Sequence, residues 1–208
     1  MTEREGVIQF ELLYRFGSGP DSVRLHDLDA WRSILFRLRL IGRDPPRYGG
    51  LGFGNVSMRT AGGFVVSGSQ TGDRPSLGAD GYCRVTRCEP EANRICAIGP
   101  IKPSSEAMTH GAVYRASASA QCVLHGHSPE LWHAASKLGL AVTDPAVPYG
   151  TPAMAREVAR LCTGQLDTDR AVFVMGGHED GVIAFGPDVA STGALLVATL
   201  AQALAAAN

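Results

Sequence analysis

Residues 121–129 read QCVLHGHSP, an apolar run that ends in two histidines separated by a single glycine. The apolar run predicts a buried strand from Gln121 to His127. Side chains two positions apart share one face of a strand, with their Cα atoms about 6.6 Å apart. His125 and His127 can therefore direct both imidazoles at one metal ion, and Gly126 is expected to leave the opposite face open. The same spacing also occurs by chance in proteins that bind no metal.

Strand and helix patterns alternate on both sides of this strand. Alternating or short apolar runs predict strands at residues 7–16, 56–59, 63–67, 82–87, 171–175 and 182–185. Capping and stop residues predict helices that begin after Asp27 or Asp29, at Ser104 (running to about Ala118), at Pro129, after Thr151 and after Asp188. Because strands and helices are interspersed throughout the chain, the sequence indicates a layered α/β or α+β fold.

Composition excludes several classes of protein. The chain has 208 residues, of which 45% are hydrophobic and 19% charged, as is typical of one compact globular domain. Its net charge of -1 provides no positive field for nucleic acid or an anionic membrane. Five scattered cysteines without a CxxC pair predict reduced thiols and a cytoplasmic location. No apolar signal core follows Met1, and the apolar tail at residues 193–207 is shorter than a membrane span, so we interpret it as a buried helix.

A third histidine strengthens the prediction of a metal site. His178 lies in the sequence Gly176-Gly-His-Glu-Asp-Gly181, a tight turn between two predicted strands. Functional residues concentrate in such loops, although a histidine there could also do no more than stabilise the turn. Three histidines without a fourth protein ligand leave an open coordination position, which is typical of catalytic zinc. His26 and His133 lack such a setting, and we interpret them as packing residues.

Polar, glycine-rich segments near the histidines are candidates for binding an anion. The segment Lys102–Glu106 opens a predicted helix, where Ser104 and Ser105 lie beside free backbone N–H groups at the positive end of the helix dipole. A plain capping motif, with a serine as N-cap and a glutamate in the first turn, explains the same residues. Gly49–Gly54 and Ser67–Gly72 would also let a ligand approach the backbone closely, although each could be only a turn.

Taken in chain order, these segments resemble the class II aldolase/adducin family, in its zinc-dependent, fuculose-phosphate aldolase-like branch. The resemblance covers roughly residues 28–205, and its motifs are Gly54-Asn55-Val-Ser-Met-Arg59, Ser67-Gly…Thr71-Gly72, Pro103-Ser-Ser-Glu106-xxx-His110-xxx-Tyr114, His125-Gly-His127-Ser-Pro129 and His178-Glu-Asp-Gly181…Gly186. The chain departs from the family where it reads Gly-Phe-Gly-Asn55 in place of the commoner Gly-Gly-Asn. It departs again at Gly-His178-Glu-Asp-Gly, where Asn-His-Gly is commoner, and the predicted strand at residues 7–16 lies outside the resemblance.

The resemblance implies a fold, a metal and a set of site residues. The implied fold has three αβα layers, with a central, largely antiparallel sheet between helices. It forms a single domain over residues 1–208, of which residues 1–25 are an N-terminal strand extension. The implied metal is Zn²⁺, with Mn, Co or Fe as alternatives, on His125, His127 and His178, and Glu106 acts as acid/base and as a further ligand. A phosphate would be bound by Gly54, Asn55, Thr71, Gly72, Ser104 and Ser105, with Ser67-Gly68 as the alternative to Thr71-Gly72.

The expected activity is that of a metal-dependent lyase, an aldolase or a dehydratase. It would act on a sugar phosphate or related keto-polyol through a zinc-stabilised enediolate. Glu106 favours a lyase, since the family's epimerase branch has aspartate there. The alternatives are a sugar-phosphate epimerase and a non-catalytic, adducin-like binding domain. The expected partners are a small-molecule substrate and further copies of the chain in a homotetramer, not nucleic acid or a membrane.

Overall fold

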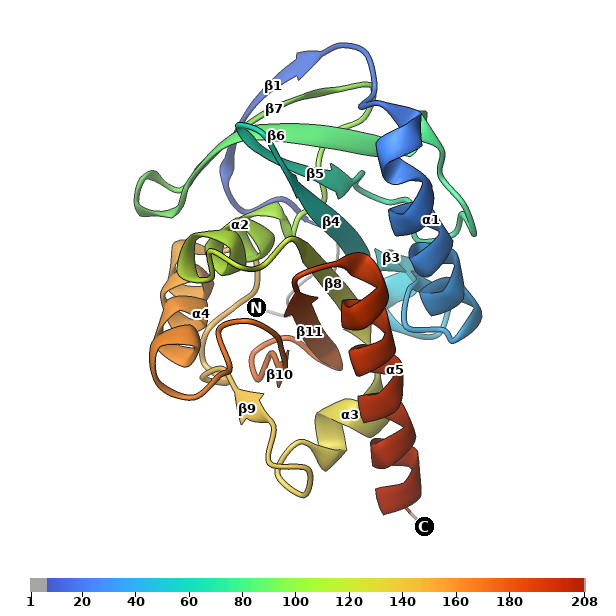
Figure 1. Cartoon of the computed structure of the whole chain (residues 1–208), viewed down its shortest axis with the longest axis vertical. Helices are drawn as coiled ribbons and strands as arrows, with labels where there is room; N and C mark the ends of the chain where they lie inside the picture. Colours follow the sequence, from blue (N-terminus) through green and yellow to red (C-terminus); the bar gives the residue numbers. More distant parts are fainter. Residues whose placement is uncertain (1–6, 208) are drawn as a thin grey trace.

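The computed structural model describes residues 7–207, so residues 1–6 of the predicted N-terminal extension lie outside it. Its strands are β1 (Glu11–Phe16), β2 (Gly42–Arg43), β3 (Gly52–Phe53), β4 (Asn55–Thr60), β5 (Gly63–Ser67), β6 (Tyr82–Glu89), β7 (Arg94–Gly99), β8 (Cys122–His127), β9 (Ala141–Val142), β10 (Ala171–Val174) and β11 (Gly181–Gly186). Nine of them form one sheet in the order β1-β7-β6-β5-β4-β8-β11-β10-β9 (Figure 1). Neighbours are antiparallel except at the two edges, where β1 is parallel to β7 and β9 to β10.

Helices cover both faces of this sheet. They are α1 (Ser22–Arg37), α2 (Ala107–Ala116), α3 (Pro129–Ala134), α4 (Pro152–Gly164) and α5 (Val189–Ala206). Val123 of β8 packs in the core beneath α2 and α4, and Leu124 packs in the core beneath α1, α3 and α5. The predicted three-layer αβα fold is therefore confirmed. His125 and His127 share the face of Val123, which places them on the side of α2 and α4.

Two predicted helix starts are wrong, for related reasons. α1 begins at Ser22, so Asp27 and Asp29 lie inside it. The Asp29 carboxylate instead accepts hydrogen bonds from the Ser76 hydroxyl at 2.6 Å and the Leu77 N–H at 3.1 Å. α2 begins at Ala107, after a turn in which the Ser104 hydroxyl oxygen accepts from the N–H of Glu106 at 3.2 Å. The side chains of Asp29 and Ser104 thus form hydrogen bonds with groups outside the helices that they were expected to cap.

Two further details differ from the sequence-based expectation. Strand β7 was not predicted. Its residues Ile95 to Ile98 are all apolar, so the sequence does not show the alternation of buried and less buried side chains that the strand has in the structure. The face of β8 opposite the histidines is closed, not open. A Cβ atom on Gly126 would lie 3.1 Å from the carbonyl oxygen of Leu40, so glycine here allows the segment that follows α1 to pack close to the strand.

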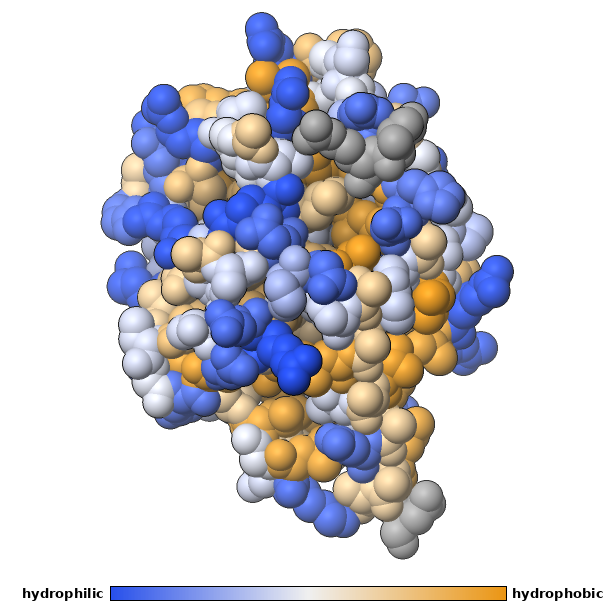
Figure 2. All heavy atoms as spheres, viewed as in Figure 1, coloured by the Kyte–Doolittle hydropathy of each residue, from blue (hydrophilic) through white to orange (hydrophobic). Residues whose placement is uncertain are grey.

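Helix α5 has two different faces. Leu196, Leu200 and Ala203 are buried against the sheet, as expected of a packed helix. By length and composition alone, α5 would also be apolar enough to cross a membrane, and much of it is not buried. Leu204 is 48% exposed, and Figure 2 shows a largely apolar surface along this helix. The helix therefore combines a core-forming face with an exposed apolar face.

Gly193 sets the distance between α5 and α1. A Cβ atom at this position would lie 2.2 Å from the ring of Trp31. We expect Gly193→Ala to lower the free energy of unfolding by about 2 kcal/mol through overpacking, measured by urea denaturation. Gly164→Ala is the matched control, because nothing lies within 4 Å of a Cβ atom there. Equal stability of the two variants would contradict this tight packing.

Candidate metal centre

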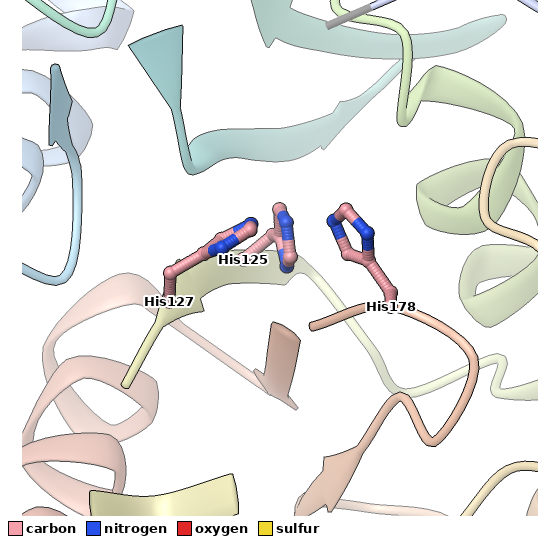
Figure 3. Close-up of side chains that lie close together, drawn as sticks. All are labelled: His125, His127 and His178. Carbon is pink, nitrogen blue, oxygen red and sulfur yellow. The ribbon is translucent and has the colours of Figure 1, made fainter. Parts of the chain in front are cut away.

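Three histidines from two parts of the chain converge under α2 and α4. His125 and His127 come from β8, and His178 comes from the turn between β10 and β11 (Figure 3). One ligand atom from each ring lies within 4.8 Å of the others. Their exposed fractions are 0%, 1% and 3%. Three imidazoles this close and this buried have the ligand chemistry and the geometry of a metal site.

Glycines shape the turn that presents His178. A Cβ atom on Gly176 would lie 2.4 Å from the carbonyl oxygen of Thr143, and one on Gly177 would lie 2.2 Å from that of Val147. A Cβ atom on Gly181 would lie 2.6 Å from the His178 ring itself. The turn can therefore pack against the segment that follows β9 while the imidazole folds back toward β8. This close packing therefore requires the three glycines of the Gly-Gly-His-Glu-Asp-Gly sequence.

The hydrogen bonding of His125 fits a metal ligand. Its Nδ1 lies 3.0 Å from the carbonyl oxygen of Val182, to which it donates. A neutral imidazole with its proton on Nδ1 presents a lone pair on Nε2. That Nε2 is buried and has no hydrogen-bond partner among residues 7–207. A packing histidine would leave this acceptor unsatisfied, whereas a metal ion would use it.

Glu106 lies next to the histidines at the start of α2. It is 1% exposed, and its Oε1 is 3.6 Å from Nε2 of His178. The Thr109 hydroxyl donates to its Oε2 at 2.8 Å. One carboxylate oxygen is thus fixed by α2 while the other faces the histidines. This placement suits a carboxylate that binds the metal or moves a proton beside it.

Burial makes the three histidines sensitive to acid when no metal is bound. It lowers the pKa of His125 to about 4, against a smaller opposing effect of the Val182 carbonyl. It also lowers the pKa values of His127 and His178 well below the usual 6.5, and neighbouring histidines add to the effect. Unfolded histidines bind protons below about pH 6.5, so the unfolded state takes up more protons than the folded state between pH 6.5 and 4. The stability present above this window is therefore lost as the pH falls.

We expect the metal-free protein, kept in chelator, to lose stability on mild acidification. His125 alone should cost about 2 kcal/mol between pH 7.5 and pH 5, and the other two histidines should add to this. Urea denaturation at both pH values measures the loss. A free energy of unfolding that stays constant across this window would contradict burial of neutral imidazoles.

The predicted anion-binding residues fall into two groups. Asn55 is buried opposite His125 in the β4–β8 pair, so both side chains lie on one face. Ser104 donates its N–H to the carbonyl oxygen of Ser67 at 3.1 Å, and Gly68 forms a bridge with Pro103. Of the two alternative pairs, Ser67-Gly68 therefore lies directly beside the serines that precede α2. Ser105, the second of these serines, is 4% exposed.

The other predicted residues are engaged elsewhere. Thr71 is linked to this group only through its hydroxyl, which donates to the carbonyl oxygen of Gly68 at 2.8 Å. Gly72 packs against Gly52 of the β2–β3 pair. Gly54 has a φ of 75° and packs against Ile41, so this glycine allows the backbone to bend before β4.

Several aromatic residues at the centre were not predicted from the sequence. The Tyr149 ring centroid lies 4.4 Å from that of His178. The ring centroid of Tyr48 lies 4.6 Å from that of His127, and the ring centroid of Phe53 lies 5.3 Å from it. The Tyr48 hydroxyl donates to Oδ2 of Asp180 at 2.6 Å. These rings enclose the histidines, and the Pro-Tyr149-Gly sequence was the one local indication of an aromatic residue held in an ordered loop.

A buried polar chain also reaches the centre. Nδ1 of His110 and the hydroxyl of Tyr114 each lie 2.7 Å from Oγ of Ser57. Burial lowers the pKa of His110 well below its usual range, with a further contribution from His125, and raises that of Tyr114. His110 is therefore neutral and close enough to His125 for the two to interact electrostatically.

The fold and this centre agree with the family comparison. Residues 46–205 match the class II aldolase and adducin N-terminal domain. The chain therefore belongs to the class II aldolase and adducin family.

Individual relatives indicate the range of proteins with this fold. The chain is 33% identical over 102 residues to a methylthioribulose-1-phosphate dehydratase of Gluconacetobacter diazotrophicus, a match that spans 48% of this chain and 47% of that protein, about half of each. Its structure is similar to L-fuculose-1-phosphate aldolase from Thermus thermophilus, with a TM-score of 0.64, 20% identity and coverage of 88% and 92%. It is also similar to YgbL from Klebsiella pneumoniae, named with aldolase, epimerase and decarboxylase as alternatives (TM-score 0.63, 18% identity, 89% of each chain). At these identities the two structures show the fold alone.

Proposed function

We propose that this protein is a metal-dependent lyase, an aldolase or a dehydratase, that acts on a sugar phosphate or a related keto-polyol. The observation that carries the proposal is the buried convergence of three imidazoles, one with an unused Nε2 lone pair, beside the Glu106 carboxylate. Three histidines are a known ligand set of catalytic zinc, so Zn²⁺ is the proposed metal. When bound, it supplies Lewis acidity that polarises a ketone and its neighbouring hydroxyl group.

The chain's own residues supply the remaining functions. Glu106 accepts and returns the proton, since the Thr109 hydroxyl holds one of its oxygens and leaves the other facing the centre. Tyr149, Tyr48 and Phe53 exclude water from the histidines. Buried backbone and hydroxyl groups beside Ser67-Gly68 and Ser104-Ser105 would bind the phosphate. Glutamate at position 106 also favours a lyase over an epimerase, as the family resemblance implies.

A homo-oligomer is part of this proposal. The exposed apolar face of α5 supports it, because a second copy of the chain could bury this surface. Sedimentation velocity tests it, and a monomer at micromolar concentration would contradict it.

Activity screening with metal analysis tests the proposed function. The protein, purified without chelator, is assayed for metal by elemental analysis. It is then given methylthioribulose 1-phosphate and a series of ketose 1-phosphates with their unphosphorylated forms. Loss of water or release of an aldehyde would support a lyase, whereas a change of configuration alone would identify an epimerase. Absence of both metal and turnover would favour an adducin-like binding domain.

A further inference from the structure

Strand β1 is an edge of the nine-stranded sheet, and no strand among residues 7–207 pairs with its outer side (Figure 1). On its inner side the N–H of Glu11 donates to the carbonyl oxygen of Asn93 at 2.8 Å, where β7 begins. Backbone groups of successive residues point to opposite edges of a strand, so those of Leu12 and Tyr14 point outward, away from β7. A row of outward N–H and C=O groups can bind a further strand.

The exposed side chains of β1 have a symmetric pattern. Leu13 is 50% exposed, and the exposed residues Glu11 and Arg15 lie two positions to either side of it. These three side chains share one face, since they alternate with Leu12 and Tyr14, which pack against the core beneath α2 and α4. Charged residues on an edge strand commonly prevent pairing. Opposite charges at equal distances from a central leucine instead complement a second copy of the same strand in antiparallel orientation.

We propose that β1 pairs antiparallel with β1 of a second copy of the chain, about a two-fold axis at Leu13. In this register Leu13 lies across from its own equivalent, and Glu11 lies across from Arg15 of the second copy. Leu12 and Tyr14 then exchange backbone hydrogen bonds across the axis. The central leucines form a non-hydrogen-bonded pair, in which side chains approach most closely. The outward backbone groups and the exposed charges therefore agree on one register.

The same pairing covers an exposed aromatic side chain. Phe16 is 77% exposed. It would lie across from Phe10 of the second copy, a core residue that is 6% exposed, so the contact would remove apolar surface from water. β1 precedes residues 46–205, which match the family domain, so the family comparison does not imply this interface. It is also distinct from the apolar face of α5.

Exchanging the two charges tests the register. Glu11→Arg and Arg15→Glu each place like charges together at two symmetric contacts, and each should weaken association about 30-fold. A 1:1 mixture of the two variants has opposite charges at both contacts and should associate as the wild type does. Sedimentation velocity over a concentration series measures association, and Tm reports folding. Arg84→Glu, at an exposed position of β6, makes the same charge change as Arg15→Glu and should have no effect.

A disulfide locates the axis directly and does not depend on any other interface. Leu13→Cys would place two cysteines across the axis with Cα atoms about 4.5 Å apart, a separation that a disulfide can span. Cys96 is the β7 neighbour of Leu13, so the variant also carries Cys96→Ser. With oxidised glutathione it should form a covalent dimer on a non-reducing gel. Arg84→Cys in the same Cys96→Ser background is the control and should stay uncrosslinked.

Three results would overturn the inference. They are equal association of the wild type and Arg15→Glu, failure of the mixed charge variants to associate, and equal crosslinking of the two cysteine variants. The cysteine pair decides the matter if a charge variant folds poorly. Zinc content should be unchanged throughout, because β7, β6, β5 and β4 lie between β1 and the histidines of β8. Failure of this interface would therefore leave the proposed lyase function intact.

Discussion

His127→Ala is expected to weaken zinc binding by at least about 100-fold, because it removes one of three imidazole donors, and loss of an outer-shell partner alone costs 10- to 100-fold. His127 is 1% exposed and its ring lies 5.0 and 4.8 Å from those of His125 and His178. Among the described residues, His125, His127 and His178 form the group of possible metal ligands whose ligand atoms lie within 4.8 Å of one another. Competition against a chromogenic chelator measures the affinity.

His133→Ala is the matched control for this variant. His133 lies on α3, is exposed, and contacts the carbonyl oxygen of Pro129 at 2.7 Å. Its loss should leave zinc affinity unchanged. Equal affinities for His127→Ala and the wild type would remove His127 from the ligand set and, with it, the basis of the proposed function.

Glu106→Gln is expected to lower turnover by about 100- to 10,000-fold, the usual range for loss of a general acid or base. Glutamine has nearly the same shape and can still accept the hydrogen bond from Thr109. The fold and most of the zinc affinity should therefore be retained, so that the loss appears in kcat. The measurement is turnover of whichever substrate the screen identifies, together with zinc content and Tm.

Glu130→Gln controls for the loss of one negative charge. Glu130 is an exposed residue of α3 that accepts from the Ser128 hydroxyl at 2.7 Å. Its replacement should leave turnover near that of the wild type. If Glu106→Gln matched Glu130→Gln in kcat, another group would have to move the proton.

Features that depend on local pattern could be predicted from the sequence. The apolar run before His125 predicted β8, and the spacing of the two histidines placed them on one face. Thr151 and Asp188 were correctly expected to cap α4 and α5, and each accepts a hydrogen bond from the helix's own first turn. In these cases the stabilising partner lies within a few residues in the chain.

Features that depend on distant partners could not be predicted in this way. Asp29 has the sequence context of a cap, yet it bonds to a loop nearly 50 residues away. The convergence of His178 with β8 followed from the family resemblance, since no local pattern specifies which strands become neighbours. Tyr149 and Tyr48 were missed because their contacts with histidine rings depend on how two loops pack.

The three histidines belong to elements that should differ in how easily they open. β8 lies near the middle of the sheet, with β4 and β11 hydrogen-bonded to its two edges, so releasing His125 or His127 requires disruption of the whole layer. His178 is held on a short turn closed by hydrogen bonds to Met175 and Gly181. Fluctuations of such a turn cost much less free energy than global unfolding. An ion at this site could therefore exchange with solvent through a local opening of the turn, while β8 and the rest of the domain stay folded.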